Sequence, residues 1–365
     1  MARADDLDNP LYFVQAQYTH DSNLTRTSQA QADSYLSVTA GGQGTMYLGR
    51  QQLAGNLSVY RNKYSTHSGY DYNGYDGKLD WLYQIGNAVS GDIGCEQSQT
   101  RISFVDTNGT NSLVKNRNCK AGVKVSPTGI WSWGATLGSN TFRYSAAALN
   151  YLDRDESSLD TYAGYTSKGE NNVVGYLTHT RYKFTNLFLP TTHEPDVYTQ
   201  NDLGIRGNYR LTADTNTSFR IGRLSRSDPN LPQRAFNGIN GRIGGTWQAT
   251  GKTALNAALY RNVGAAIELN TNDVVVNGGS VGAVMKPTGK LTLTATAIAE
   301  ARKYQVNQGS NSHTDNYRSV LAQADYDFSR KGRVSFSVRR EDRSSNLSIS
   351  DYKANVVQVT VNFSI

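Results

Sequence analysis

The sixteen residues from Ser350 to Ile365, SDYKANVVQVTVNFSI, decide how the rest of the chain is interpreted. From Val357 onward every second residue is apolar, and the residues between them are Gln, Thr, Asn and Ser. Because successive side chains of a strand point to opposite faces, this stretch has one apolar and one polar face. An exposed apolar edge strand pairs with other chains, whereas the last strand of a closed barrel pairs with the first and turns its apolar face to lipid. The stretch therefore favours a membrane β-barrel over the terminal strand of a soluble sandwich.

The composition fits a barrel wall that is one residue thick. Apolar residues make up 38% of the 365 residues, and the chain has 23 Tyr, 34 Gly and 7 Pro. A wall with lipid on one side and water on the other needs about half of its strand residues to be polar. No apolar run approaches the roughly 20 residues of a transmembrane helix. The sequence thus predicts an all-β, transmembrane, antiparallel up-and-down β-barrel and excludes a helical membrane protein.

Period-two alternation recurs along the whole chain and predicts about eighteen strands, with sixteen as the alternative. We expect residues 1–10 to form a periplasmic lead-in and residues 11–365 to form a single barrel domain. An even number of strands brings both termini to the same side, which we expect to be the periplasm. The predicted strands are 11–20, 33–40, 47–62, 76–86, 90–104, 116–126, 130–143, 158–167, 172–184, 200–211, 215–225, 236–249, 252–263, 273–286, 290–304, 315–328, 332–342 and 351–365.

The links between these strands alternate in length, as they do in outer-membrane barrels with short periplasmic turns and longer external loops. All seven prolines fall outside the predicted strands, which is expected because proline cannot donate to a sheet ladder. The segment 185–199 is the most distinctive long link, either a structured loop over or in the pore or an ordinary surface loop. The predicted short links are Gly41–Thr45, Asn87–Val89, Ser126–Gly129, Ser167–Asn171, Thr212–Asp214, Thr250–Gly251, Pro287–Gly289 and Ser329–Lys331.

Two further features concern the compartment. Ala2 and Ala4 have the small-residue spacing of a signal-peptide cleavage site, so we expect a mature chain in the bacterial outer membrane, in contact with its lipid and lipopolysaccharide. Cys95 and Cys119 fall on neighbouring predicted strands at similar distances from the intervening loop. One disulfide, formed in an oxidising periplasm, and two free thiols are both compatible with this spacing.

The sequence offers little for catalysis. The five histidines form no recognisable catalytic pattern with other residues, so no catalytic residue is predicted. The acidic residues Asp153, Asp155 and Glu156 form either a cation site or a solvated loop. No helix is expected after the glycines at 238–245, so they do not predict a phosphate loop. We expect no enzyme activity, no cofactor, no metal and no nucleic-acid partner.

Basic residues are the informative polar feature, since Lys and Arg number 37 and Asp and Glu number 30. Cations that line a confined aqueous path favour anionic solutes. In the alternative interpretation these cations pair with lumen carboxylates such as Asp80, Asp202, Glu300, Asp325 and Glu341 and stabilise the wall. Tyr60 and Tyr260, with Phe13, share the polar face and are placed to stack on sugar rings. The cations that we predict to line the pore are Lys120, Lys124, Arg206, Arg210, Arg220, Arg242, Arg302 and Arg339.

The opening stretch carries a family resemblance. Residues Asp8–Arg26 read DNPLYFVQAQYTHDSNLTR, with Asp21, Ser22 and Asn23 closing the first strand before Arg26. This pattern resembles the opening of the outer-membrane barrels encoded in exopolysaccharide operons, the EpsL type within a broad group of β-barrel porins. The resemblance implies export of a newly made polysaccharide, with an inner-membrane polymerase and a periplasmic bridging protein as partners. It supplies no catalytic residues.

The sequence is therefore compatible with three functions. The first is an export pore for an acidic exopolysaccharide, guided by lumen Arg and Lys. The second is a general or anion-selective diffusion porin. The third is a barrel enzyme or a receptor that acts through its loops, including 185–199.

Overall fold

The computed structural model describes residues 11–104, 107, 110–167, 169, 171–188, 195–229, 235–265, 271–306, 313–347 and 350–365. Within them the chain forms one antiparallel sheet of eighteen strands, which confirms the predicted strand number and rules out sixteen. Two short 3₁₀ helices, η2 (Ser68–Tyr70) and η4 (Ala147–Leu152), lie in long connections. The strands are β1 (Leu11–Asp21), β2 (Asp33–Leu48), β3 (Gln51–Tyr64), β4 (Tyr72–Ile85), β5 (Val89–Arg101), β6 (Leu113–Val125), β7 (Trp131–Tyr144), β8 (Arg154–Thr166), β9 (Asn172–Phe188), β10 (Pro195–Thr212), β11 (Thr215–Ser227), β12 (Phe236–Thr250), β13 (Thr253–Ala265), β14 (Thr271–Met285), β15 (Leu291–Val306), β16 (Thr314–Asp327), β17 (Gly332–Ser345) and β18 (Tyr352–Ser364).

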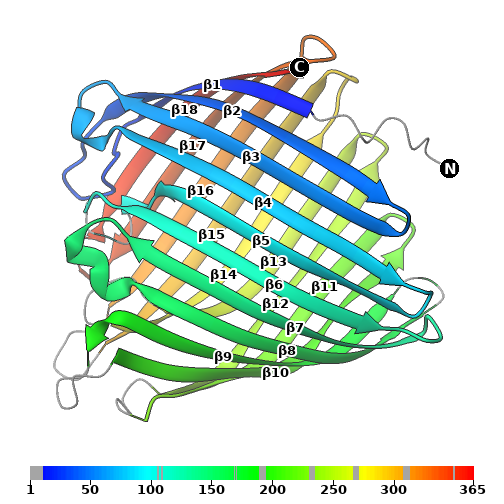
Figure 1. The fold of residues 1–365 in the computed structure, drawn as a ribbon. Coiled ribbons are helices and arrows are strands. Elements are labelled where there is room, and N and C mark those ends of the chain that lie inside the picture. Colours follow the sequence, from blue (N-terminus) through cyan, green and yellow to red (C-terminus); the bar gives the residue numbers. More distant parts are fainter. Residues whose placement is uncertain are drawn as a thin grey trace.

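The barrel closes between its first and last strands. β1 pairs with β2 on one side and with β18 on the other, from Phe13 opposite Ser364 to Asp21 opposite Val356. The backbone N–H of Ile365 also donates to the carbonyl of Tyr12 at 2.8 Å. Figure 1 shows the strands running obliquely around one barrel, with the start of β1 and the end of β18 together on the side of the short turns. The stretch that decided the sequence interpretation is therefore the strand that seals the barrel.

The two faces of the wall differ sharply in exposure. On β10 the side chain of Asp202 is almost fully buried, since the residue is 5% exposed, whereas the next residue, Leu203, is 62% exposed. Side chains on the concave side of a narrow barrel crowd one another, so the buried, polar face is the inner one. Residues paired in register share a face, and this assigns an inward or an outward side to every strand.

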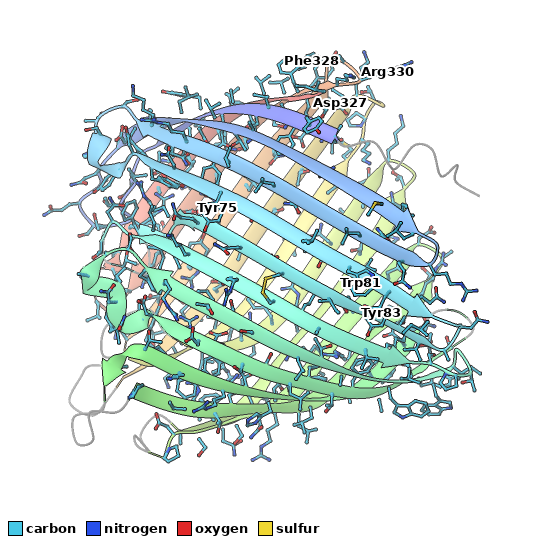
Figure 2. All side chains as sticks on the ribbon, in the orientation of Figure 1. Tyr75, Trp81, Tyr83, Asp327, Phe328 and Arg330 are labelled. Carbon is cyan, nitrogen blue, oxygen red and sulfur yellow. A yellow bond between two sulfur atoms is a disulfide. The ribbon has the colours of Figure 1, made fainter. Side chains whose placement is uncertain are left out.

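Outward aromatic side chains gather near the short turns. Figure 2 shows Trp81 toward the short-turn end of β4. The Trp131 and Tyr165 rings, on β7 and β8, lie 5.3 Å apart in an edge-on contact. Aromatic girdles of this kind mark the boundary between lipid and water in membrane barrels. All four tryptophans belong to this aromatic belt, whose exposed members are Tyr12, Trp81, Trp131, Trp133, Tyr165, Tyr209, Trp247, Tyr326 and Phe363.

No helix within the described residues is both long and apolar enough to cross a membrane.

Three details of the predicted strand map are wrong. The short link expected at Gly41–Thr45 is strand, because β2 continues to Leu48 and the turn lies at Gly49, whose φ is +64°. The glycines that suggested a turn instead make room for an aromatic ring, since a Cβ at Gly41 would lie 2.6 Å from the Phe13 ring. The other predicted short links coincide with turns between strands.

The second and third corrections concern 185–199. β9 extends to Phe188 and β10 begins at Pro195, so most of the expected loop is strand. Residues 189–194 lie outside the described residues, as do 1–10, the predicted lead-in. Pro195 is thus inside a strand, at its first position, where a missing N–H does not interrupt the ladder.

Cys95 and Cys119 form a disulfide, which resolves the alternative left by the sequence. They are direct partners in the register of β5 and β6. Both lie on the outward face, in an apolar hollow that is also lined by Leu79, Trp81 and Leu137. The bridge therefore faces the lipid side of the wall rather than the pore.

Candidate functional site

The structure places all ten predicted pore-lining residues on the inward face. Lys120 and Lys124 lie on β6, Arg302 lies on β15, and Arg339 lies on β17. The arrangement on β10 to β13 is a direct cross-strand row in which neighbouring residues are register partners. This arginine row consists of Arg206, Arg220, Arg242 and, at its end, Tyr260; Arg210 and Tyr60 lie elsewhere on the same face.

The first two arginines of the row are neutralised by carboxylates. Arg206 donates to Asp160 at 2.8 Å, and Arg220 forms an ion pair with Asp202. Asp202 also accepts from the Tyr176 hydroxyl at 3.2 Å and from the Asn240 amide at 3.0 Å. Direct neighbours of like charge repel, so these carboxylates allow the arginines to stand side by side.

Three of the other six predicted cations also have carboxylate partners. Lys120 pairs with Asp92 at 2.6 Å, Arg302 with Glu300 at 2.7 Å, and Arg339 with Glu341 at 3.0 Å. Of the five carboxylates expected as partners, Asp202, Glu300 and Glu341 do pair with arginines. The other two bind elsewhere: Asp80 pairs with Lys78, and Asp325 accepts from Gln323 and Ser335. The sequence missed Asp92 and Asp160, which the register brings beside their cations.

Arg210, Arg242 and Lys124 are different, because none of them forms an ion pair with a carboxylate within the described part of the chain. Arg242 lies over the Tyr260 ring, 5.3 Å from its centroid, and Arg210 donates to the Ala213 carbonyl at 3.0 Å. Both arginines line a hollow of about 940 Å³ in the barrel wall. Small residues such as Gly244 and Ala258 open this space, and none of its described lining residues is acidic. We refer to it as the arginine hollow.

The two predicted aromatic residues are tied to the wall. Tyr60 lies over Gly74, where a Cβ would come within 2.2 Å of the ring, and its hydroxyl donates to the Gln99 carbonyl at 2.9 Å. The Tyr260 hydroxyl donates to Glu300 at 2.6 Å. Their ring faces remain on the inward side, so a role in stacking on a solute stays a prediction.

The acidic segment at 153–156 is internally neutralised. Asp153 accepts from the Tyr144 backbone N–H at 2.7 Å and from the Asn186 amide at 2.9 Å. Asp155 pairs with Arg143, and Glu156 pairs with Arg154. Over the described residues, no three His, Cys, Asp or Glu side chains converge in a way that could hold a metal ion.

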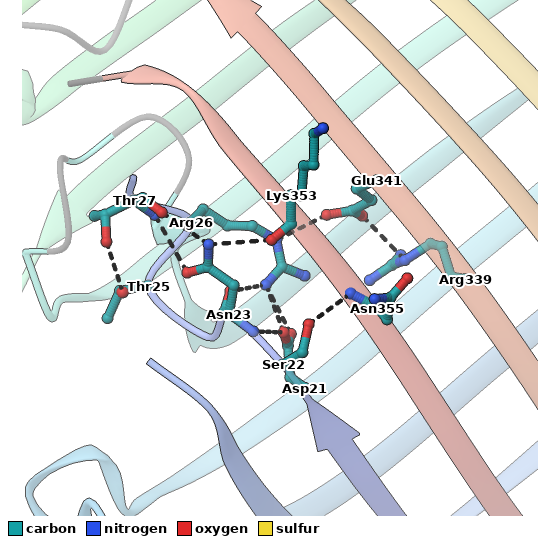
Figure 3. A network of polar contacts seen from close by, with 10 residues as sticks. All are labelled: Asp21, Ser22, Asn23, Thr25, Arg26, Thr27, Arg339, Glu341, Lys353 and Asn355. Atoms are coloured by element: carbon teal, nitrogen blue, oxygen red, sulfur yellow. Dashed lines mark hydrogen bonds and ion pairs between the residues drawn. The ribbon is translucent and has the colours of Figure 1, made fainter. Parts of the chain in front are cut away.

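The connection after β1 folds inward and is held there by buried ion pairs. Arg26, with a φ of +54°, donates to Asp21 at 2.8 Å and to Glu341 on β17 at 2.7 Å (Figure 3). Asn23 reinforces the bend by donating to the Lys353 carbonyl at 3.2 Å. Burial lowers the pKa of the Arg26 guanidinium, but its two carboxylate partners outweigh this effect and raise the pKa above its ordinary value. The sequence singled out the Asp21–Arg26 motif only as a resemblance, and its role is this latch.

Beside the latch lies a second cavity, which the sequence did not predict. It has a volume of about 390 Å³ and is lined by arginines, including Arg101, and by tyrosine and phenylalanine rings. The Arg101 guanidinium sits 4.8 Å from the Tyr64 ring centroid, 4.7 Å from that of Tyr72 and 5.6 Å from that of Phe104. Among the described residues it has no carboxylate partner. We call this space the aromatic cavity.

Comparisons with known proteins agree with this architecture. Residues 208–365, about two fifths of the chain, match the family model described as "Putative beta-barrel porin 2". The resemblance to exopolysaccharide-operon barrels rests on residues 8–26, outside this match. A search of curated proteins finds no significant match.

Solved porin structures share the fold. OccK2 (OpdF) of Pseudomonas aeruginosa superposes with a TM-score of 0.56 at 10% sequence identity, covering 98% of each chain. OpdK of the same species, crystallised with vanillate, gives 0.53 at 10% identity, also covering 98% of each chain. OccAB3 of Acinetobacter baumannii gives 0.50 at 9% identity with the same coverage. At these identities the likeness concerns the fold alone. The chain thus has the closed eighteen-stranded fold of a β-barrel porin, and its C-terminal part matches a porin family model.

Proposed function

We propose that the protein is an outer-membrane diffusion porin that favours anions. The arginine hollow is the observation that carries this proposal, because Arg210 and Arg242 present positive charge to the lumen and pair with no carboxylate of the described residues. A cation in a confined aqueous path raises the local concentration of anions. Five of the other six predicted lumen cations pair with carboxylates, so we expect selectivity to depend mainly on these two residues, with a contribution from Lys124.

The orientation is part of the same proposal. Short turns face the periplasm and long connections face outward in barrels of this class. The start of β1 and the end of β18 lie on the short-turn side, so in the proposed orientation both would face the periplasm.

Reversal potentials in planar bilayers under a potassium chloride gradient test the function. We expect the wild-type pore to prefer chloride and the double variant Arg210→Gln/Arg242→Gln to lose most of this preference. The charge-retaining variant Arg210→Lys/Arg242→Lys is the matched control and should keep it. A wild-type pore that prefers potassium, or a glutamine variant with unchanged selectivity, would overturn the proposal.

A second candidate is export of an acidic exopolysaccharide, and the aromatic cavity favours it. Sugar rings stack on aromatic faces, and a uronate carboxylate would complement the Arg101 guanidinium. In this case a periplasmic bridging protein and an inner-membrane polymerase would be the partners. Oligouronates should then block conductance at concentrations where neutral oligosaccharides do not, and Arg101→Gln should weaken the block. Equal block by both sugars would speak against this candidate.

A further inference from the structure

The outward face of the barrel carries a second, basic belt at the end opposite the aromatic belt. On β3 the outward residues nearest the long connection are Arg61 and Lys63, on β11 the cation is Arg223, and on β13 it is Arg261. All four side chains are exposed. Each lies within about four residues of the long-loop end of its strand, so the cations form a ring at one depth rather than a scattered set.

Two groups make this belt denser. The first basic cluster, on β6, β7 and β9, consists of Lys115, Arg117, Arg143, Arg181 and Lys183. The second basic cluster, on β15 to β18, consists of Lys303, Arg318, Arg340 and Lys353.

Few acidic groups balance these cations. Among the described side chains the acidic residues on this surface are Asp155, which pairs with Arg143 at 2.6 Å, and Asp342, which lies 3.7 Å from Lys353. Lys115 and Arg143 are direct register partners. Like charges at such positions destabilise a sheet, and Asp155 offsets this effect for Arg143 only. The surface therefore keeps an excess of cations that anionic groups from outside the chain can bind.

The belt borders the apolar surface directly. On β13 the exposed Leu259 lies two residues from Arg261, and on β17 Val338 lies two residues from Arg340. From Arg117 to the end of β6 at Val125 is eight residues, or about 26 Å along the strand and about 20 Å along the barrel axis at a tilt of about 40°. Arginine side chains extend this span to about the 25 Å of a membrane barrel's apolar band. The cations thus lie at the depth of lipid headgroups.

The two ends of the barrel carry different residue types at the expected membrane boundaries. The short-turn end presents tryptophan and tyrosine on its strands, and its cations, such as Lys286, Lys290 and Arg330, lie in the turns beyond them. The long-loop end presents arginine and lysine on the strands themselves. This asymmetry fits a membrane whose two leaflets differ in phosphate density.

We propose that the basic belt binds the phosphates of a multiply phosphorylated glycolipid of the lipid A type, in the leaflet that surrounds the long-loop end. Neighbouring strands are about 4.8 Å apart, so each cluster presents several cations within reach of one headgroup that carries more than one phosphate. Guanidinium groups bind phosphate in a bidentate manner. The inference goes beyond pore function and does not depend on it.

Titration of the detergent-solubilised protein with bisphosphorylated lipid A tests the proposal, with phosphatidylglycerol and dephosphorylated lipid A as comparison ligands. Replacing Lys115, Arg117 and Lys183 by glutamine together should weaken lipid A binding about a hundredfold, since each cation near an anionic surface contributes about a factor of five. The matched control removes the same charge at the other end, as Lys286→Gln/Lys290→Gln/Arg330→Gln, and should bind like wild type.

The outcomes separate clearly. Equal affinity for phosphatidylglycerol would show that any anionic lipid suffices and would overturn the assignment to a phosphorylated glycolipid. Equal loss in the control variant would overturn the assignment to the belt. Ion selectivity in bilayers should be unchanged in the cluster variant, so failure of this proposal is distinguishable from failure of the pore proposal. Heat-dependent migration of the barrel on gels verifies that each variant is folded.

Discussion

Arg220 and Arg242 are direct register partners on β11 and β12, yet among the described residues only Arg220 of the two is paired with a carboxylate. Asp202 neutralises the charge of Arg220, whereas Arg242 lies over the Tyr260 ring. Adjacent cations on one wall therefore differ: Arg220 takes part in an ion pair between strands, and Arg242 is a cation to which we assign the anion preference proposed for the lumen.

Removing a neutralising carboxylate should increase anion preference. Asp160→Asn leaves Arg206, its partner at 2.8 Å, with an uncompensated charge. A unit charge about 10 Å from an ion in water contributes about 0.4 kcal/mol, or about a factor of two. We expect the chloride-to-potassium permeability ratio to rise about twofold in bilayer recordings. An unchanged ratio would show that the Arg206 charge does not reach the ion path.

The outward disulfide should resist reductant in the intact barrel. Cys95 and Cys119 lie in an apolar hollow of the lipid-facing surface and close a span of 24 residues. In a chain-entropy model such a cross-link contributes about 3–4 kcal/mol to stability. We expect dithiothreitol to reduce it slowly in liposomes and quickly in urea, as read by thiol labelling.

The matched variant Cys95→Ala/Cys119→Ala should fold, since the β5–β6 ladder remains, and should unfold at a lower urea concentration. Rapid reduction in liposomes would contradict the outward, apolar placement.

Glu341→Gln should release the inward-folded connection. The Glu341 carboxylate holds Arg26 at 2.7 Å, and both side chains are 8% exposed. Loss of one partner of a buried ion pair costs about 3 kcal/mol or more, and Asp21 retains part of the interaction here. We expect trypsin to cleave after Arg26 much faster than in wild type.

Arg333→Gln provides the control, because its pair with Asp327 is largely exposed and solvent screening leaves it little effect on stability. If both variants were cleaved at the same rate, the latch would not limit opening.

The contact between Asp33 and His67 should make the β3–β4 connection acid-sensitive. Burial raises the pKa of the Asp33 carboxyl, but hydrogen bonds from the His67 side chain and from the backbone N–H groups of His67, Ser34 and Thr66 outweigh it and lower the pKa to about 2. A carboxyl with a lowered pKa stabilises the fold above its ordinary value of 3.8. That contribution, about 2 kcal/mol, is lost as the pH falls toward 2.

Hydrogen exchange of the Thr66 and His67 amides, which donate to Asp33 at 3.0 and 2.9 Å, should therefore be protected equally at pH 7 and pH 5. Protection should decline below about pH 4 once the intrinsic exchange rate is taken into account. In Asp33→Asn this decline should disappear. A decline between pH 7 and pH 5 would point to a different titrating group.

Much of this fold can be predicted from local patterns in the sequence. Successive side chains of a strand point to opposite faces, so an odd or even position along the strand gives the face of each residue. Arg206, Lys120 and Tyr260 could therefore be assigned to the lumen before their neighbours were known. The same locality explains why Val357 to Ile365 identified a sealing strand, and why proline and glycine marked most turns.

The alternation of side chains along a strand does not show which residues of distant segments are in contact. From the sequence alone, Gly41 is predicted to be a turn residue. The register places Phe13 opposite it, and this shows that Gly41 makes room for the Phe13 ring. The pair Arg26–Glu341 joins residues 315 positions apart, and the aromatic cavity depends on loops that fold inward. Which cations lack a carboxylate partner among the described residues, as Arg242 does, also depends on where each carboxylate falls on a neighbouring strand. The sequence by itself determined the strands and their faces, because side-chain alternation is a local property. The tertiary structure decided which charges, cysteines and rings meet, because barrel closure and register bring together residues that are far apart in the chain.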